Sequence, residues 1–165
     1  MNKFLNYFTT AALILALAIF ASCGGGGEEP DAPIDPCEIN ADFLISGTAT
    51  VKKVTDPNQT INQPGNWSGF TLSFSGSKDG GSYSTNISQI IANNNDDQSF
   101  LNVWAASGSW TFDSSDANCK TLTVDGRTVN ISAVSTSGLN LSFTVPDNSG
   151  RTMGIAGDWF FEFNF

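Results

Sequence analysis

Residues 121–134 read TLTVDGRTVNISAV and contain the strongest local structural signal of the chain. At its centre, Asp125-Gly126 separates two runs in which polar and apolar residues alternate. An Asp-Gly pair between alternating runs is typical of a type I′ turn joining two antiparallel strands. A two-residue turn places Leu122 opposite Val129, so apolar side chains meet on one face and polar ones on the other. The stretch therefore predicts a β-hairpin.

The same two-residue period continues over most of the chain after Asp42, with turn residues between the runs. The pattern predicts a single helical turn at 89–92 and no helix longer than that. The strands that we expect are 43–54, 67–75, 82–87, 100–104, 107–113, 121–124, 127–134, 139–145 and 157–165.

Eight or nine sequential antiparallel strands, most with one apolar face, close most simply into an up-and-down barrel. Closure also removes the unpaired edges that an open sheet would expose. We therefore predict an all-β fold with a barrel of about eight strands over residues 37–165. A two-sheet β-sandwich is the alternative, because strand counting does not separate the two architectures.

The N-terminus has the parts of a secretory signal. Lys3 supplies the positive charge, and residues 11–21 form an uninterrupted apolar run. This run is too short to cross a bilayer core, which needs about 20 helical residues. We therefore expect residues 1–22 to be a cleaved export signal.

The apolar run ends in Phe20-Ala21-Ser22-Cys23, which resembles the lipobox of bacterial lipoproteins. In those proteins small residues precede a cysteine that is diacylated, exposed by cleavage and acylated again. The resemblance implies that Cys23 carries a lipid anchor.

Residues 23–36 are rich in glycine, proline and acidic residues, a composition that cannot bury apolar area. We expect them to form a flexible acidic tether. An acidic segment soon after the cysteine resembles the surface-export signal of Bacteroidetes lipoproteins. We therefore predict that the protein is anchored in the outer membrane, either on the cell surface or on the periplasmic face.

Net charge and cysteine count limit the partners and the covalent chemistry. Without Lys3 the chain has six basic and sixteen acidic side chains, a net charge of −10, which argues against nucleic-acid binding. With Cys23 acylated, Cys37 and Cys119 form an even pair in an oxidising compartment, and we expect a disulfide between them.

Three segments together resemble the lipocalin-like lipoproteins of the Bacteroidetes: residues 44–48 (LISGT), 103–112 (VWAASGSWTF) and 139–143 (LNLSF). The similarity spans about residues 37–165. It implies a small lipid-anchored barrel from a family largely without assigned activity. Such domains usually open with Gly-x-Trp, where this chain has Gly47-Thr48-Ala49.

Catalysis is not expected. The chain has no histidine, which removes Ser–His–Asp and Cys–His catalysis and histidine metal sites. The paired carboxylates, Asp96 with Asp97 and Asp113 with Asp116, fall in or beside predicted turns, where solvation explains them. We therefore expect no catalytic residue, no cofactor and no metal site.

Aromatic residues are the candidates for ligand binding. The four tryptophans are Trp67, Trp104, Trp110 and Trp159, and most of the aromatic residues are expected in the barrel core. An apolar pocket at the barrel mouth could hold a small hydrophobic molecule. The alternative ligand is a glycan, with an exposed tryptophan stacked on a sugar.

The C-terminal alternation of aromatic residues, which ends at Phe165, also resembles the C-terminal signal of integral outer-membrane barrels. Most expected strands are shorter than the roughly 9–11 residues of a spanning strand, which favours a tethered barrel. The sequence therefore predicts a non-catalytic, lipid-anchored envelope lipoprotein with a membrane-spanning barrel as an alternative.

Overall fold

The computed structural model describes residues 33–58, 61–62, 64–147 and 155–165. Residues from Ile34 onwards form one structural unit. The expected signal peptide, Cys23 and most of the tether lie outside the described residues.

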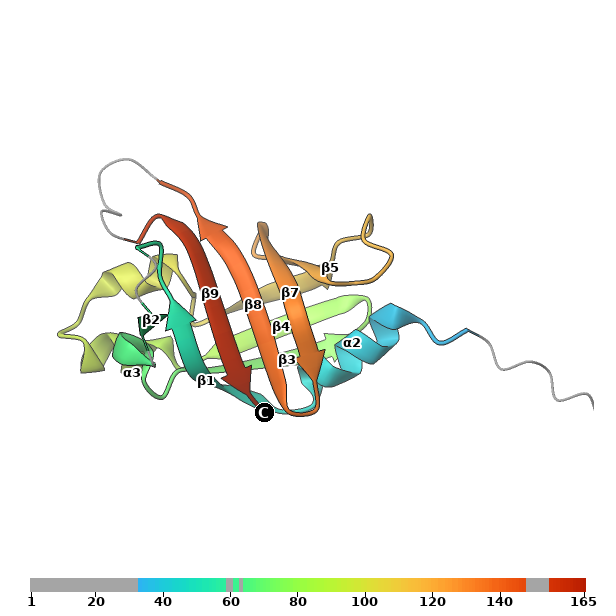
Figure 1. The fold of residues 1–165 in the computed structure, drawn as a ribbon, viewed down its shortest axis with the longest axis horizontal. Helices are drawn as coiled ribbons and strands as arrows, with labels where there is room; N and C mark the ends of the chain where they lie inside the picture. The colour runs from blue at the N-terminus through green and yellow to red at the C-terminus, as the bar shows by residue number, and fades with distance from the viewer. Residues whose placement is uncertain (1–32, 59–60, 63, 148–154) are drawn as a thin grey trace, which may run out of the picture. The chain divides into compact units, whose positions relative to one another are not determined.

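The described chain forms a closed antiparallel β-barrel (Figure 1). Strands β1 and β3 to β9 pair in sequential order, and β9 pairs back with β1 to close eight strands into a ring. The short β2 pairs only with β1. The predicted eight-stranded barrel is confirmed, and the β-sandwich alternative is not found. The strands are β1 (Thr48–Thr55), β2 (Ile61–Asn62), β3 (Thr71–Ser77), β4 (Gly80–Thr85), β5 (Ser107–Phe112), β6 (Thr121–Val124), β7 (Arg127–Ser135), β8 (Gly138–Val145) and β9 (Gly157–Asn164).

The β6–β7 hairpin has the register that the sequence predicts. Leu122 pairs with Val129 across β6 and β7. Asp125 and Gly126 both have positive φ angles, 48° and 79°, as a type I′ turn requires.

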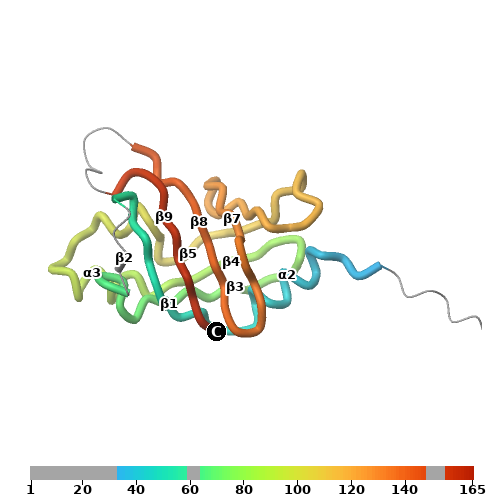
Figure 2. The backbone as a smooth tube through the Cα atoms, viewed as in Figure 1, coloured from blue at the N-terminus to red at the C-terminus, as the bar shows by residue number. Residues whose placement is uncertain are grey.

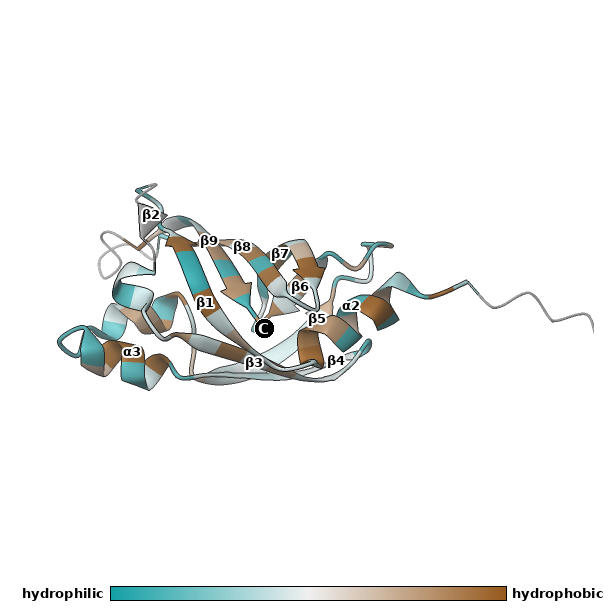
Figure 3. Cartoon of the chain, turned by 60° about the horizontal axis from the view of Figure 1, so that its bottom comes forward, coloured by the Kyte–Doolittle hydropathy of each residue, from teal (hydrophilic) through white to brown (hydrophobic). Residues whose placement is uncertain are grey.

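Alternating burial along the strands builds an aromatic core, and Figure 3 shows apolar and polar residues alternating along several strands. On β9, Trp159, Phe161 and Phe163 point inward, and their rings stack along the strand. The Phe143 ring of β8 stacks on Phe161 at 5.8 Å between centroids. Trp67 packs edge-on against four aromatic rings, so the centre of the barrel is filled by aromatic side chains.

Helix α2 (Pro36–Ile45) corrects the prediction that residues 43–45 begin the first strand and that no long helix is present. Asp35 caps this helix by accepting a hydrogen bond from the Cys37 backbone N–H at 2.9 Å, and proline occupies the first turn. The helix buries Ala41 and Leu44. Because only these two side chains are buried, the helix has no clear hydrophobic periodicity. The local sequence feature that indicates it is the pair of capping residues, Asp35 and Pro36.

The long connection between β4 and β5 is helical. Helix α3 (Ile87–Asn93) confirms the helical turn predicted at 89–92. The predicted strand at 100–104 is wrong, because residues Gln98–Asn102 form the 3₁₀ helix η2, capped by the Asp97 side chain. A further 3₁₀ helix, η1 (Gly65–Trp67), precedes β3.

Because the strands alternate in direction, their connections gather at two ends of the barrel. The α2 end holds α2, the β3–β4, β5–β6 and β7–β8 connections and the C-terminus. The opposite end, called the mouth here, holds η1, α3, η2 and the β6–β7 turn. The C-terminus lies beside the β7–β8 turn (Figure 2), in keeping with the pairing of Gly138 with Asn164.

A disulfide joins Cys37 of α2 to Cys119, which precedes β6, as the cysteine count predicts. The Cα atoms of the pair are 5.1 Å apart. The amide of Asn40 reinforces the link by donating to the carbonyl oxygens of Asn118 and Cys119. Cys119 is buried, with Cys37 of α2 bonded to it.

Within the described part of the chain, none of the helices has the length and apolar character that a membrane span requires.

Candidate ligand-binding cleft

The barrel wall opens at the mouth, where β7 and β8 separate. Pairing of these two strands runs from Ser135 with Gly138 to Asn130 with Ser142, and stops there. Towards the mouth, β7 pairs only with β6, and β8 pairs only with β9. The separation leaves a cleft of about 500 Å³ between the two strands.

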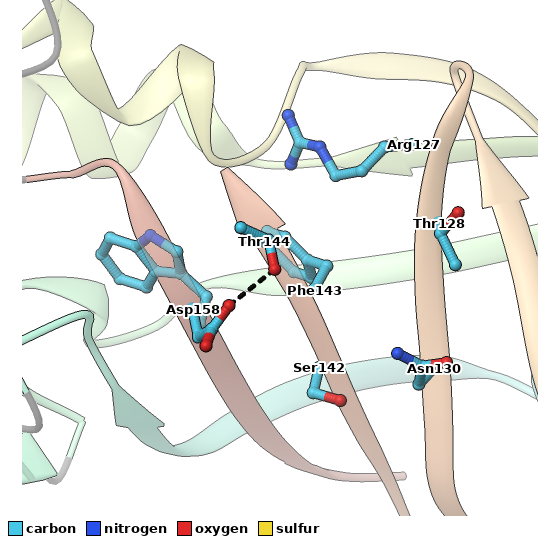
Figure 4. A pocket seen from close by; sticks show the side chains of 8 residues that line it. Arg127, Thr128, Asn130, Ser142, Phe143, Thr144 and Asp158 are labelled. Atoms are coloured by element: carbon cyan, nitrogen blue, oxygen red, sulfur yellow. Dashed lines mark hydrogen bonds between the residues drawn. The ribbon is translucent and has the colours of Figure 1, made fainter. Parts of the chain in front are cut away.

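Polar side chains line the cleft, with aromatic rings among them (Figure 4). Two inward-facing aromatics, Phe143 and Trp159, supply the rings. Asp158 accepts a hydrogen bond from the Thr144 hydroxyl at 2.6 Å. The cleft therefore offers hydrogen-bonding groups next to two rings that are at most 5 % exposed. The remaining lining residues are Arg127, Thr128, Asn130 and Ser142.

Arg127 reaches from the start of β7 towards Phe143 and lies 5.0 Å from the centre of that ring, a cation–π contact. Its guanidinium donates to the carbonyl oxygens of Asn102 and Val103, at 2.9 and 2.6 Å, at the end of η2. Burial lowers the pKa of Arg127, and the nearby Tyr83 and Asp125 oppose that shift. Among the described residues it forms no ion pair. Arg127 thus attaches η2 to the barrel and keeps N–H donors to spare.

Asp125, in the β6–β7 turn, organises the neighbouring strands. Its carboxylate accepts from the Tyr83 hydroxyl at 2.5 Å and from the Ser109 backbone N–H at 2.8 Å. Burial and the hydrogen bond to Asp125 raise the pKa of Tyr83 far above its ordinary value. Gly108 makes room for this arrangement, because a Cβ there would overlap the Asp125 carboxylate.

These groups also line a smaller cavity of about 150 Å³. Its polar lining residues are Tyr83, Trp104, Asp125 and Arg127. The Trp104 indole N–H is buried and has no hydrogen-bond partner among the described residues. The apolar lining residues are Leu101, Val103, Ala105, Val124 and Val129.

All four tryptophans considered as ligand-binding residues belong to the core, and each is at most 5 % exposed. Trp67 lies at its aromatic centre. Trp110 and Trp159 donate their indole N–H groups to backbone carbonyl oxygens, at 3.1 and 2.8 Å. Trp104 and Trp159 line the cavity and the cleft, respectively. Trp67 and Trp110 line neither.

The carboxylates of Asp113 and Asp116 accept hydrogen bonds from nearby residues in the β5–β6 connection. Asp113 accepts from the backbone and hydroxyl of Ser115, and Asp116 accepts from the backbone N–H groups of Asn118 and Lys120. These hydrogen bonds hold the pKa of both carboxyls below the ordinary range. The described residues contain no group of three potential metal-ligating side chains.

Sequence reasoning missed the cleft residue Arg127 and the pair of Tyr83 with Asp125. Asp125 was recognised as a turn residue, but its partners lie 16 and 42 residues away in the chain, and no local pattern brings them together. Comparisons with protein-family models, curated proteins and solved structures found no match to this chain.

Proposed function

We propose that this protein is a lipid-anchored lipoprotein of the cell envelope, and that its barrel binds a hydroxyl-rich ligand such as a glycan in the cleft at the mouth. The observation that carries the proposal is the lining of that cleft. Side chains from three neighbouring strands present hydroxyl, amide, carboxylate and guanidinium groups beside the Phe143 and Trp159 rings. Sugars carry many hydroxyl groups, and the polar side chains of this lining complement them.

The geometry supports this ligand class better than a hydrophobic molecule inside the barrel. Rings from Trp67, Phe161 and Phe163 occupy the barrel interior, with neighbouring centroids 5–6 Å apart. A ligand in that space would have to displace packed core side chains, which is costly because protein interiors are close-packed.

The proposed anchor rests on the sequence around Cys23, and one feature of the barrel supports it. The outward side chains of β7 to β9 are mostly polar, whereas a membrane-embedded barrel presents an apolar band. This supports attachment through a lipid over the alternative of a membrane-spanning barrel.

Mass spectrometry of the purified protein tests the anchor. We expect the mature N-terminus at Cys23 with acyl chains attached, and release of the Cys23→Ser protein from membranes by carbonate. An unmodified N-terminus elsewhere, or a Cys23→Ser protein that stays in the membrane, would contradict it.

Calorimetric titration with a panel of polysaccharides tests the binding site. Asn130→Ala removes an exposed amide from the cleft, and Ser132→Ala, on the same outer face of β7 but outside the cleft, is the matched control. We expect Asn130→Ala to weaken binding about five- to tenfold, as the loss of one hydrogen bond predicts. The proposal would be contradicted if no polysaccharide bound. If a hydrophobic fluorescent probe then bound saturably, the hydrophobic-ligand alternative would be supported instead.

A further inference from the structure

A second groove lies beside the cleft, along β9. Its volume is about 640 Å³. Ser142 and Asp158 line both spaces, so the groove and the cleft are adjacent. Each space alone has a volume within the roughly 300–1,000 Å³ of a small-molecule site. Together they offer room for a chain of sugars rather than for a single ring.

Strand pairing aligns the side chains of the cleft with those of the groove. Asn130 of β7 lies opposite Ser142 of β8. Ser142 also lies opposite Phe160 of β9, which in turn lies opposite Thr55 of β1. Directly opposed residues share a face of the sheet, and these four lie on the outer face of the barrel wall. The four strands lie side by side (Figure 1). With neighbouring strands about 4.8 Å apart, the row extends roughly 14 Å across the wall.

Phe160 adds an aromatic ring to this outer row. Its neighbours in β9, Trp159 and Phe161, point inward and are buried, whereas Phe160 is partly exposed. Among the described residues, Phe160 neither packs against the core nor contacts another aromatic ring. A single exposed apolar residue is ordinary on a protein surface. The setting of Phe160 is unusual, because its ring lines a groove together with polar side chains.

The chemistry of sugar rings matches this row. Sugar rings carry hydroxyl groups around their edges and C–H groups on their faces. A C–H face that stacks on the Phe160 ring removes apolar surface from water, which is favourable. Hydroxyl groups of the same chain can donate to Asp158 and accept from the amide of Asn130. The groove thus supplies the exposed aromatic ring that the cleft lacks.

The charge of the groove limits the kind of glycan. The carboxylates of Asp56 and Asp158 line it, and none of the described residues in its lining is basic. Without residues 1–22 the protein has six basic and sixteen acidic side chains. Such a surface repels an acidic polysaccharide. Uncharged sugars avoid this repulsion, and their hydroxyl groups can donate to the carboxylates.

We infer that the cleft and the groove form one binding surface for an extended, uncharged oligosaccharide, and that Phe160 stacks on one of its sugar rings. The inference rests on the proposed function, since it names the kind of glycan and extends the site beyond the cleft.

Calorimetric titration of the full chain in detergent micelles tests the inference with chains of different length. The uncharged probes are cellohexaose, maltohexaose and mannohexaose, each with its disaccharide, and the acidic probe is hexagalacturonic acid. We expect at least one uncharged hexasaccharide to bind about tenfold more tightly than its disaccharide, because only the longer chain reaches both the cleft and the groove. Hexagalacturonic acid is expected not to bind.

Variants of Phe160 separate recognition from folding. Phe160→Leu keeps an apolar side chain but removes the ring, so we expect this hexasaccharide to bind about five- to tenfold more weakly. Phe160→Tyr keeps the ring and is expected to bind like the unaltered protein. Asn164→Ala, on the same outer face of β9 but at the α2 end, is the matched control. Thermal unfolding of each variant checks that the barrel is folded.

The outcomes distinguish this inference from the proposed function. Weakening by Asn130→Ala but not by Phe160→Leu overturns the extended surface and retains the glycan-binding cleft. Weakening by Phe160→Leu alone refutes the cleft, and the single continuous surface with it. Equal affinity for disaccharides and hexasaccharides, or tighter binding of hexagalacturonic acid than of any uncharged chain, overturns the inference. Failure of all three uncharged hexasaccharides to bind also overturns it, and failure of the polysaccharide panel as well refutes the proposed function.

Discussion

At the scale of single residues, Asp125 has two structural roles that its position in a turn does not suggest. Its positive φ angle allows the tight β6–β7 connection, and its carboxylate joins Tyr83 of β4 to the Ser109 backbone of β5. Three neighbouring strands are thereby linked at the mouth, beside the cavity of Trp104 and Arg127. Substitutions here should therefore affect both stability and the proposed site.

The raised pKa of Tyr83 predicts a loss of stability at alkaline pH. The folded protein raises its pKa, whereas an unfolded tyrosine titrates near pH 10. Below pH 10 both states keep the proton. Above pH 10 only the unfolded state releases it, so the free energy of unfolding is expected to fall as pH rises. Denaturant unfolding at several pH values measures this, and Tyr83→Phe should flatten the dependence.

The absorbance of tyrosinate provides an independent check. The chain has two tyrosines, and Tyr83 is the only one after residue 22. In protein lacking residues 1–22, we expect almost no ionisation of the folded state at pH 10–11. A spectroscopic pKa close to 10 in the folded protein would contradict the buried hydrogen bond to Asp125.

At the scale of elements, α2 depends on its covalent link to the barrel. It has ten residues and buries only two side chains, Ala41 and Leu44. A helix of this length is marginal on its own, and this contact area is small. The disulfide to Cys119 and the Asn40 hydrogen bonds therefore contribute much of its attachment to the barrel.

Replacing Cys37 and Cys119 together by serine is expected to lower the free energy of unfolding by roughly 4 kcal/mol, because the bridge closes a long loop. Chemical denaturation under non-reducing conditions measures the loss. Reductant should destabilise the unaltered protein by a similar amount and leave the double variant unchanged. Equal stability of the two proteins would show that α2 does not need the bridge.

At the scale of the whole molecule, pairing of β1 with β9 turns a sequence of hairpins into a closed barrel. Closure gives both edge strands a partner, so the barrel from Ile34 onwards contains its own core. The separation of β7 from β8 at the mouth is an interruption in this continuous wall, and it is where the cleft forms.

The barrel is therefore expected to fold without the N-terminal segment. A chain consisting of residues 34–165 should unfold at the same temperature as the longer protein, because this unit holds the core that the described residues form. Differential scanning calorimetry of both chains checks this. A midpoint lower by more than about 4 °C, which corresponds to roughly 1 kcal/mol for a domain of this size, would mean that earlier residues stabilise the barrel.

Most of the strand pattern, the Asp125-Gly126 hairpin and the pairing of Cys37 with Cys119 follow from the sequence, which also favours a closed barrel over a β-sandwich. These features follow from local rules: side chains alternate along a strand, and turn residues set the register of neighbours. The export signal and lipid anchor at Cys23, and the resemblance to lipocalin-like lipoproteins, stay predictions.

Helices α2 and η2 arise from local capping together with packing against the barrel, whereas the candidate site depends on the tertiary structure. Residues 43–45 and 100–104 are apolar enough for strands, but a capping aspartate begins each helical segment, and packing against the barrel completes it. The cavity likewise joins Tyr83, Trp104 and the Asp125–Arg127 hairpin, which come from three different segments of the chain. Such contacts depend on how the closed barrel brings distant segments together, and no periodicity in the sequence encodes that.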